Sequence, residues 1–94
     1  MMRIKITYDP FYLHQQGELA TLEFYASSYR YQVEDGYLWH YLKPKRDSDQ
    51  RDPSTMHGVL HLLGFRSFPT GELRAKEPLV EVGQRAIVYI KVTE

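Results

Sequence analysis

The Asp35-Gly36 pair constrains the fold of this chain more than any other feature, because it stands between two runs of strand-forming residues. A type I′ turn needs positive φ at both central residues, which Asp and Gly adopt at low cost. The pattern therefore predicts a β-hairpin over residues 29–42 with a two-residue loop. In that register Glu34 faces Tyr37, and successive pairs point to alternate faces of the hairpin.

The two predicted faces of the hairpin differ in chemistry. The residues of one face are Val33, Leu38, Tyr29, Leu42, Tyr31 and His40. Those of the other face are Tyr37, Trp39 and Tyr41, opposite Glu34, Gln32 and Arg30. Because burial of apolar surface drives folding, we expect the aliphatic face to join the core.

The aromatic row of the second face is the main candidate for binding. The row of Tyr37, Trp39 and Tyr41 runs into the cations Lys43, Lys45 and Arg46. Rings beside cations stack unpaired bases and hold their phosphates, whereas Trp, Tyr and Arg also dominate protein interfaces. A sheet covered on both sides would instead bury the row as ordinary core.

Net charge ranks these alternatives. The 94 residues include 12 Lys and Arg against 12 Asp and Glu, spread evenly along the chain. Affinity for nucleic acid rests on many cation contacts to phosphate, so a neutral chain favours a protein partner over a nucleic acid. The sequence thus predicts a small non-catalytic interaction module of the regulator or inhibitor type. Its expected partner-binding residues are Arg30, Tyr37, Trp39, Tyr41, Lys43, Lys45 and Arg46.

A helix is predicted over about residues 53–63. Asp52 suits the N-cap, Pro53 the first helical position, and Gly64 the left-handed residue after the end. The apolar residues at helical spacing are Met56, Val59, Leu60 and Leu63. A helix of this length needs a packing partner, so we expect it to lie on a sheet.

Alternating apolar residues predict the strands of that sheet. Residues 3–8 alternate clearly, and residues 19–26 fit a strand, although a helical stripe matches them as well. Residues 67–78 read as a loop marked by Pro and Gly, and residues 79–92 as two strands with a turn near Gly83-Gln84. The inward residues of the last strand are expected to be Ala86, Val88, Ile90 and Val92. The predicted fold is a single α+β domain over residues 1–94, with a mostly antiparallel sheet of about five to six strands and one helix.

The second candidate site is the pair His57 and His61, four residues apart and so on one side of the predicted helix. The octet HGVLHLLG over residues 57–64 resembles the zinc-site motif of the YbeY-type bacterial endoribonucleases, whose pattern runs H-G-x-L-H-L-x-G-Y-D-H. Arg66 and Ser67 stand where that family has its aspartate and its third histidine. The resemblance implies a metal-dependent hydrolase or an endoribonuclease-like protein with zinc or a similar divalent ion. The alternative is a structural helix with two histidines beside its apolar stripe and no cofactor, and the missing third ligand favours it.

Several classes of function are excluded or disfavoured by what the sequence lacks. Without cysteine there are no disulfides, thiolate nucleophiles or Cys-bound zinc. No serine stands in a G-x-S-x-G context, which also favours a protein that is not an enzyme. No apolar run reaches the about 18 residues of a membrane span, and the first residues lack a signal-peptide core, so we expect a cytoplasmic protein without membrane contact. Exposed sheet edges also allow two copies to pair as a homodimer.

Overall fold

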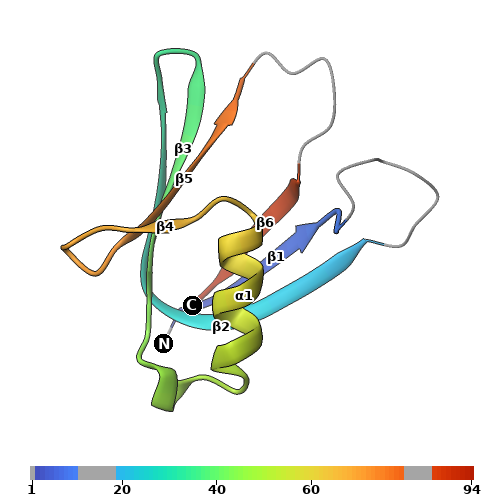
Figure 1. Cartoon of the computed structure of the whole chain (residues 1–94), viewed down its shortest axis with the longest axis vertical. Helices are drawn as coiled ribbons and strands as arrows, with labels where there is room; N and C mark the ends of the chain where they lie inside the picture. Colours follow the sequence, from blue (N-terminus) through green and yellow to red (C-terminus); the bar gives the residue numbers. More distant parts are fainter. Residues whose placement is uncertain (1, 11–18, 80–85) are drawn as a thin grey trace.

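The computed structural model describes residues 2–10, 19–79 and 86–94, which form a six-stranded antiparallel sheet and one α-helix (Figure 1). The strands are β1 (Met2–Tyr8), β2 (Ala20–Glu34), β3 (Tyr37–Pro44), β4 (Arg66–Ser67), β5 (Leu73–Pro78) and β6 (Ile87–Thr93). Their order in the sheet is β4-β5-β3-β2-β1-β6. A 3-10 turn, η1 (Asp47–Asp49), and the helix α1 (Pro53–Leu62) connect β3 to β4. The predicted α+β class and antiparallel sheet are confirmed.

The hairpin of β2 and β3 forms in the predicted register. Glu34 pairs with Tyr37, and the pairs continue in step to Tyr29 opposite Leu42. The turn residues have φ of 51° at residue 35 and 82° at residue 36, both positive as a type I′ turn requires. The alternation of side chains between the two faces of the hairpin therefore follows the sequence pattern.

One strand, β2, serves two partners along its 15 residues. Its first half pairs with β1 and its second half with β3, and the register shifts between Ala26 and Ser28. Such a bulge bends a strand, and Figure 1 shows β2 turning from the side of β1 towards the hairpin. The predicted strand over 19–26 is confirmed, and β2 continues from it into the hairpin.

The side chain of Gln50 takes the place of a strand beside β2 where β3 ends. Its Oε1 accepts a hydrogen bond from the backbone N–H of Tyr25 at 2.9 Å. Its Nε2 donates to the carbonyl oxygens of Tyr25 at 2.7 Å and Lys45 at 3.0 Å. Backbone polar groups that are shielded from water need such partners, so this amide stabilises the bend of β2.

The helix α1 begins and ends close to the predicted residues. Asp52 caps it, accepting from the backbone N–H of Thr55 at 3.1 Å and from its hydroxyl at 2.7 Å, and these bonds lower the pKa of the Asp52 carboxyl. Gly64 follows the last turn with φ of 98°. The buried residues of one core, shared by helix and sheet, include Met56, Leu60, Leu63, Phe65, Ile4, Ile6, Leu22, Phe24, Leu42 and Ala75. The helix therefore covers one side of the sheet.

The core assignment of the hairpin is correct near the base of the hairpin and wrong at its tip. Leu42 and His40 are buried, whereas Tyr31 is 68% exposed and Val33 58% exposed. The helix reaches only the part of the sheet near the bend of β2 (Figure 1), and beyond it Tyr31 and the half-buried Leu38 line an open hollow with residues of β6. Alternation in a strand shows which residues share a face, but not how far a helix covers that face.

Two further expectations need correction in the second half of the chain. Residues 67–78 are not a plain loop, because they contain part of β4 and the whole of β5. In β6, Ile90 is partly buried as expected, but Ile87 is the buried residue at the start and Val88 is exposed, because a bulge opposite Tyr8 shifts the register there. The strand and turn expected near Gly83-Gln84 lie outside the described residues. Within the described ranges, no helix has the length and apolar character needed to cross a membrane.

Candidate functional site

The side of the sheet opposite α1 carries the aromatic row. We call it the outer sheet face and define it by the strand residues that alternate with the buried ones. Its rings are Tyr25, Tyr37, Trp39, Tyr41 and Tyr89. Its cations are Arg3, Lys5, Arg30, Lys43, Arg74, Lys76 and Lys91. In the part of the chain that the structure describes, no helix packs on this face.

The rings of the row are half-buried because cationic side chains lie over them. Trp39 and Tyr41 stack along β3, with ring centroids 6.3 Å apart and planes 26° from parallel. The guanidinium carbon of Arg30 lies 3.8 Å from the centroid of Tyr41. The guanidinium carbon of Arg74, which lies on β5, is 5.2 Å from the centroid of the same ring. The row is therefore neither core nor bare apolar surface: it is a layer of rings with cations stacked on it.

Two cations of this layer, Arg74 and Lys76, come from β5 and were not expected from the sequence. In the register of β3 and β5, Tyr41 pairs with Arg74 and Trp39 with Lys76. The ammonium nitrogen of Lys76 lies 4.5 Å from the ring centroid of Tyr37 and 5.6 Å from that of Trp39. The alternation of charged Arg74, apolar Ala75 and charged Lys76 could have indicated a strand here, but the Pro and Gly residues just before it favoured a loop.

Charge is distributed unevenly between the outer sheet face and the rest of the molecule. The strands β1, β2, β3, β5 and β6 place seven cations and two carboxylates, Glu23 and Glu34, on this face. The remaining described residues hold four cations and eight carboxylates. One of those carboxylates, Glu72 just before β5, bonds Nε of Arg74 at 3.0 Å. The neutral total of the sequence thus hides a cationic face and an acidic remainder.

Five of the seven predicted partner-binding residues lie together on the outer sheet face. They are Arg30, Tyr37, Trp39, Tyr41 and Lys43. The other two, Lys45 and Arg46, follow the end of β3, and Arg46 pairs with Asp49 in η1 at 3.6 Å. The sequence predicted that the ring row runs into three cations along the chain, but only Lys43 of these lies on the face. The other cations beside the rings come from the neighbouring strands.

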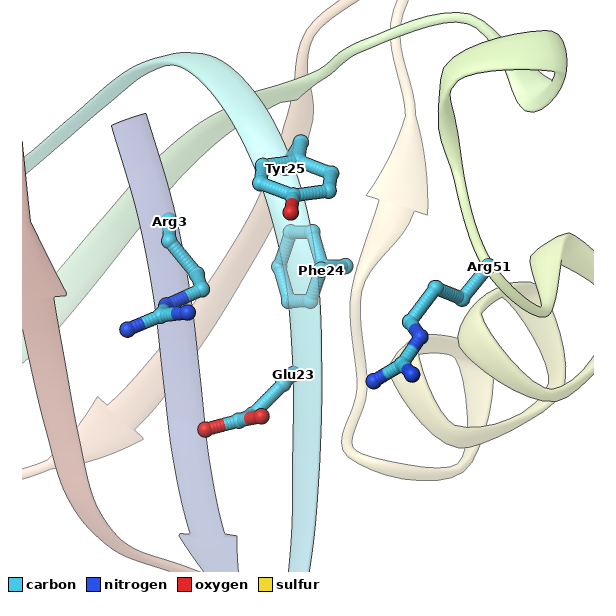
Figure 2. A pocket seen from close by; sticks show the side chains of 5 residues that line it. All are labelled: Arg3, Glu23, Phe24, Tyr25 and Arg51. Carbon is cyan, nitrogen blue, oxygen red and sulfur yellow. The ribbon is translucent and has the colours of Figure 1, made fainter. Parts of the chain in front are cut away.

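A hollow beside β2 extends the cationic surface away from the hairpin. Its outward side chains are Arg3, Glu23, Tyr25 and Arg51. Figure 2 shows Arg3 on β1 and Arg51, from the segment before α1, on either side of Glu23 and Tyr25. Arg51 lies outside the strands, so it adds a further cation at the margin of the outer sheet face.

A second group, which sequence reasoning missed, is a hydrogen-bonded chain on the opposite side of the hairpin. The hydroxyl of Tyr29 lies 2.8 Å from Nδ1 of His40, and Nε2 of His40 lies 2.8 Å from Oε2 of Glu77. A neutral imidazole with its proton on Nε2 satisfies both contacts, with Tyr29 donating to Nδ1. Burial, followed by the nearby Glu77 and then Tyr31, raises the pKa of Tyr29 to about 12. The phenol is thus held in its neutral form, which suits a hydrogen-bond donor better than a nucleophile.

The two helix histidines lie at the surface with separate partners. Nε2 of His57 lies 2.7 Å from Oδ1 of Asp47, and both side chains are exposed. Nδ1 of His61 lies 3.5 Å from the guanidinium of Arg66, which also donates to the His61 carbonyl oxygen at 3.0 Å. A catalytic zinc site takes three protein ligands. Across residues 2–10, 19–79 and 86–94, no cluster of three or more His, Cys, Asp or Glu residues is placed to hold a metal ion.

Comparison with known proteins identifies no relative of this chain: no protein-family model matches it, and no curated protein or solved structure matches it either.

Proposed function

We propose that this protein is a small non-catalytic interaction module that binds a macromolecular partner through its outer sheet face. The observation that carries the proposal is the one-sided packing of the sheet. α1 covers one side, while the other presents the stacked Trp39 and Tyr41 with the guanidinium groups of Arg30 and Arg74 over them. Trp, Tyr and Arg side chains dominate the binding energy of many interfaces.

The residue types on this face support binding in preference to chemistry. Rings, guanidinium groups and ammonium groups hold a partner by stacking and by charge, and on the described face no imidazole stands beside a hydroxyl or a carboxylate as a catalytic group needs. The acid–base chain of Tyr29, His40 and Glu77 lies on the opposite side of the hairpin. Disulfides are rare in cytoplasmic proteins, so the absence of cysteine fits that compartment, and we expect the protein to act there.

The net charge of the whole chain does not distinguish a protein partner from a nucleic acid, because the outer sheet face differs in charge from the rest of the molecule. The sequence favoured a protein partner because the chain is neutral as a whole. At physiological salt charges interact over about 8 Å, so a partner interacts with the charges of the face that it contacts, and this face is cationic. Both a protein with an acidic surface and a nucleic acid therefore fit the proposed module.

Capture from an extract of the native cells tests the proposal. The bait is the tagged full chain, compared with a Trp39→Ala/Tyr41→Ala double variant and with Tyr31→Ala. Tyr31 is the matched control, since it is an exposed ring on the other side of the same hairpin. We expect the double variant to lose the captured species and Tyr31→Ala to retain them. Equal capture by all three proteins, each with a cooperative thermal unfolding transition, would overturn the proposal.

A further inference from the structure

We infer that the macromolecule bound by the outer sheet face is a single-stranded nucleic acid, an inference that rests on the proposed function and names its partner. Seven cations and two carboxylates stand on this face, whereas the rest of the described chain is net negative. A polyanion that contacts several of these cations releases a counterion at each neutralised phosphate, which drives binding. The cationic face thus supplies the charge that the neutral sequence as a whole lacks.

The ring row selects a single strand over a duplex. Trp39 and Tyr41 stack along β3, and guanidinium groups lie over Tyr41 from both neighbouring strands. Unpaired bases stack on aromatic rings and on guanidinium planes, whereas paired bases keep their faces inside the helix.

The number of lysines favours a nucleic acid over an acidic protein. Four exposed lysines, Lys5, Lys43, Lys76 and Lys91, lie on the outer sheet face. Protein interfaces are depleted in Lys relative to the rest of the surface, while Arg and aromatic residues are enriched. Lys does bind phosphate groups, which it neutralises as a point charge without the bidentate geometry of Arg.

The cations continue across the sheet from the ring row. Arg3, Lys5 and Lys91 lie on β1 and β6, on the far side of β2 from the hairpin. Figure 2 shows Arg3 and Arg51 on either side of the hollow beside β2, with the carboxylate of Glu23 between them, so two cations and one carboxylate line this part of the surface. Strands lie about 4.8 Å apart, so the four steps from β5 to β6 span about 19 Å along the sheet. Such a span suits a strand of several nucleotides, within the about 4–16 nucleotides that single-strand-binding domains cover.

Direct titration of the full chain tests the inference. Trp39 is the one tryptophan in the sequence, so its fluorescence reports on the ring row alone. We expect mixed-sequence DNA and RNA single strands of about 12 nucleotides to quench this emission at low salt. An abasic strand of the same length keeps the phosphates but has no bases, and we expect it to bind more weakly and to leave the emission largely unchanged. Comparing the DNA and RNA strands shows whether the 2′-hydroxyl contributes.

The salt dependence of binding measures the number of phosphate contacts, and variants show which cations make them. With a labelled strand, the logarithm of the association constant is expected to fall linearly with that of salt concentration, by about 0.7 per phosphate contact. Lys76→Ala, beside the rings, and Lys5→Ala, across β2, are each expected to reduce this slope by about 0.7. Arg46→Ala is the control, since the Arg46 side chain is 84% exposed but lies off the face, and its slope should equal that of the unmodified chain.

The inference is overturned by no binding of either strand at low salt, by equal affinity for a duplex, or by tighter binding of a polyglutamate of equal charge. The last result would assign the face to acidic proteins. Failure of this inference is distinguishable from failure of the proposed function. Nuclease-resistant capture that depends on Trp39 and Tyr41 keeps the interaction module and rejects the nucleic acid, whereas capture independent of both residues rejects both.

Discussion

Tyr29, His40 and Glu77 show how single residues of this protein depend on neighbours far away in the sequence. Tyr29 and His40 lie on paired strands, and Glu77 comes from β5 on the other side of β3. His40 is buried among apolar residues, and both of its ring nitrogens have partners. A buried imidazole without partners would be costly, so the two contacts allow a polar residue at this place in the core.

Ionisation of the Tyr29 phenol makes the free energy of unfolding depend on pH in the alkaline range. Its pKa is raised to about 12 in the folded protein, while an unfolded tyrosine titrates near pH 10. Between these values only the unfolded state ionises, so we expect the free energy of unfolding to drop as the pH rises from about 10 to about 12. Urea unfolding at a series of pH values measures the drop. Tyr29→Phe lacks the ionising group and should show a smaller drop; an identical alkaline drop in that variant would contradict the assignment.

At the scale of elements, β2 depends on a side chain that lies outside the sheet. The amide of Gln50 bonds both backbone polar groups of Tyr25, next to the bulge at which β2 bends. The sequence shows only a polar stretch between β3 and α1, with nothing to indicate that one of its side chains replaces a strand. The bend of β2 places the hairpin, so Gln50 acts on the candidate face indirectly.

Replacing Gln50 by glutamate should therefore destabilise the fold at neutral pH. A carboxylate cannot donate to the Tyr25 and Lys45 carbonyl oxygens, and we expect a loss of about 1–3 kcal/mol in the free energy of unfolding. The loss should shrink at low pH, where the protonated carboxyl regains one donor. Chemical unfolding at pH 7 and at pH about 3, compared with the unmodified chain at each pH, tests this. Gln32→Glu, on the exposed hairpin, is the control and should change stability by less than about 0.5 kcal/mol.

The strands differ in how well their sequence revealed them. The hairpin was predicted to the residue because its turn chemistry and its alternation agree. β5 was missed because Pro69 and Gly71 lie just before it and half of its residues are charged. Pairing with β3 makes Leu73–Pro78 a strand, since β3 supplies the partners of its backbone hydrogen bonds.

At the scale of the whole molecule, the reach of α1 divides one hairpin face into core and surface. Leu42 and Val33 share that face by register, yet Leu42 is 1% exposed and Val33 58% exposed. We expect Leu42→Ala to lower the free energy of unfolding by about 2–5 kcal/mol. Val33→Ala should lower it by less than about 0.5 kcal/mol. Urea unfolding of the two variants measures the difference, and similar losses in both would show that the tip is packed.

The sequence by itself determined the local elements: the hairpin and its register, the capped helix, and the ring row on one face. These follow from short-range rules, because turn dihedrals, caps and alternation depend on residues close together in the chain. Only the tertiary structure decided which surface is cationic. Arg74 and Lys76 reach the rings through pairing of β5 with β3, and Arg3, Lys5 and Lys91 join the same face through β1 and β6. Charge counted along a chain carries no information about faces, since strands distant in sequence become neighbours only when the sheet forms.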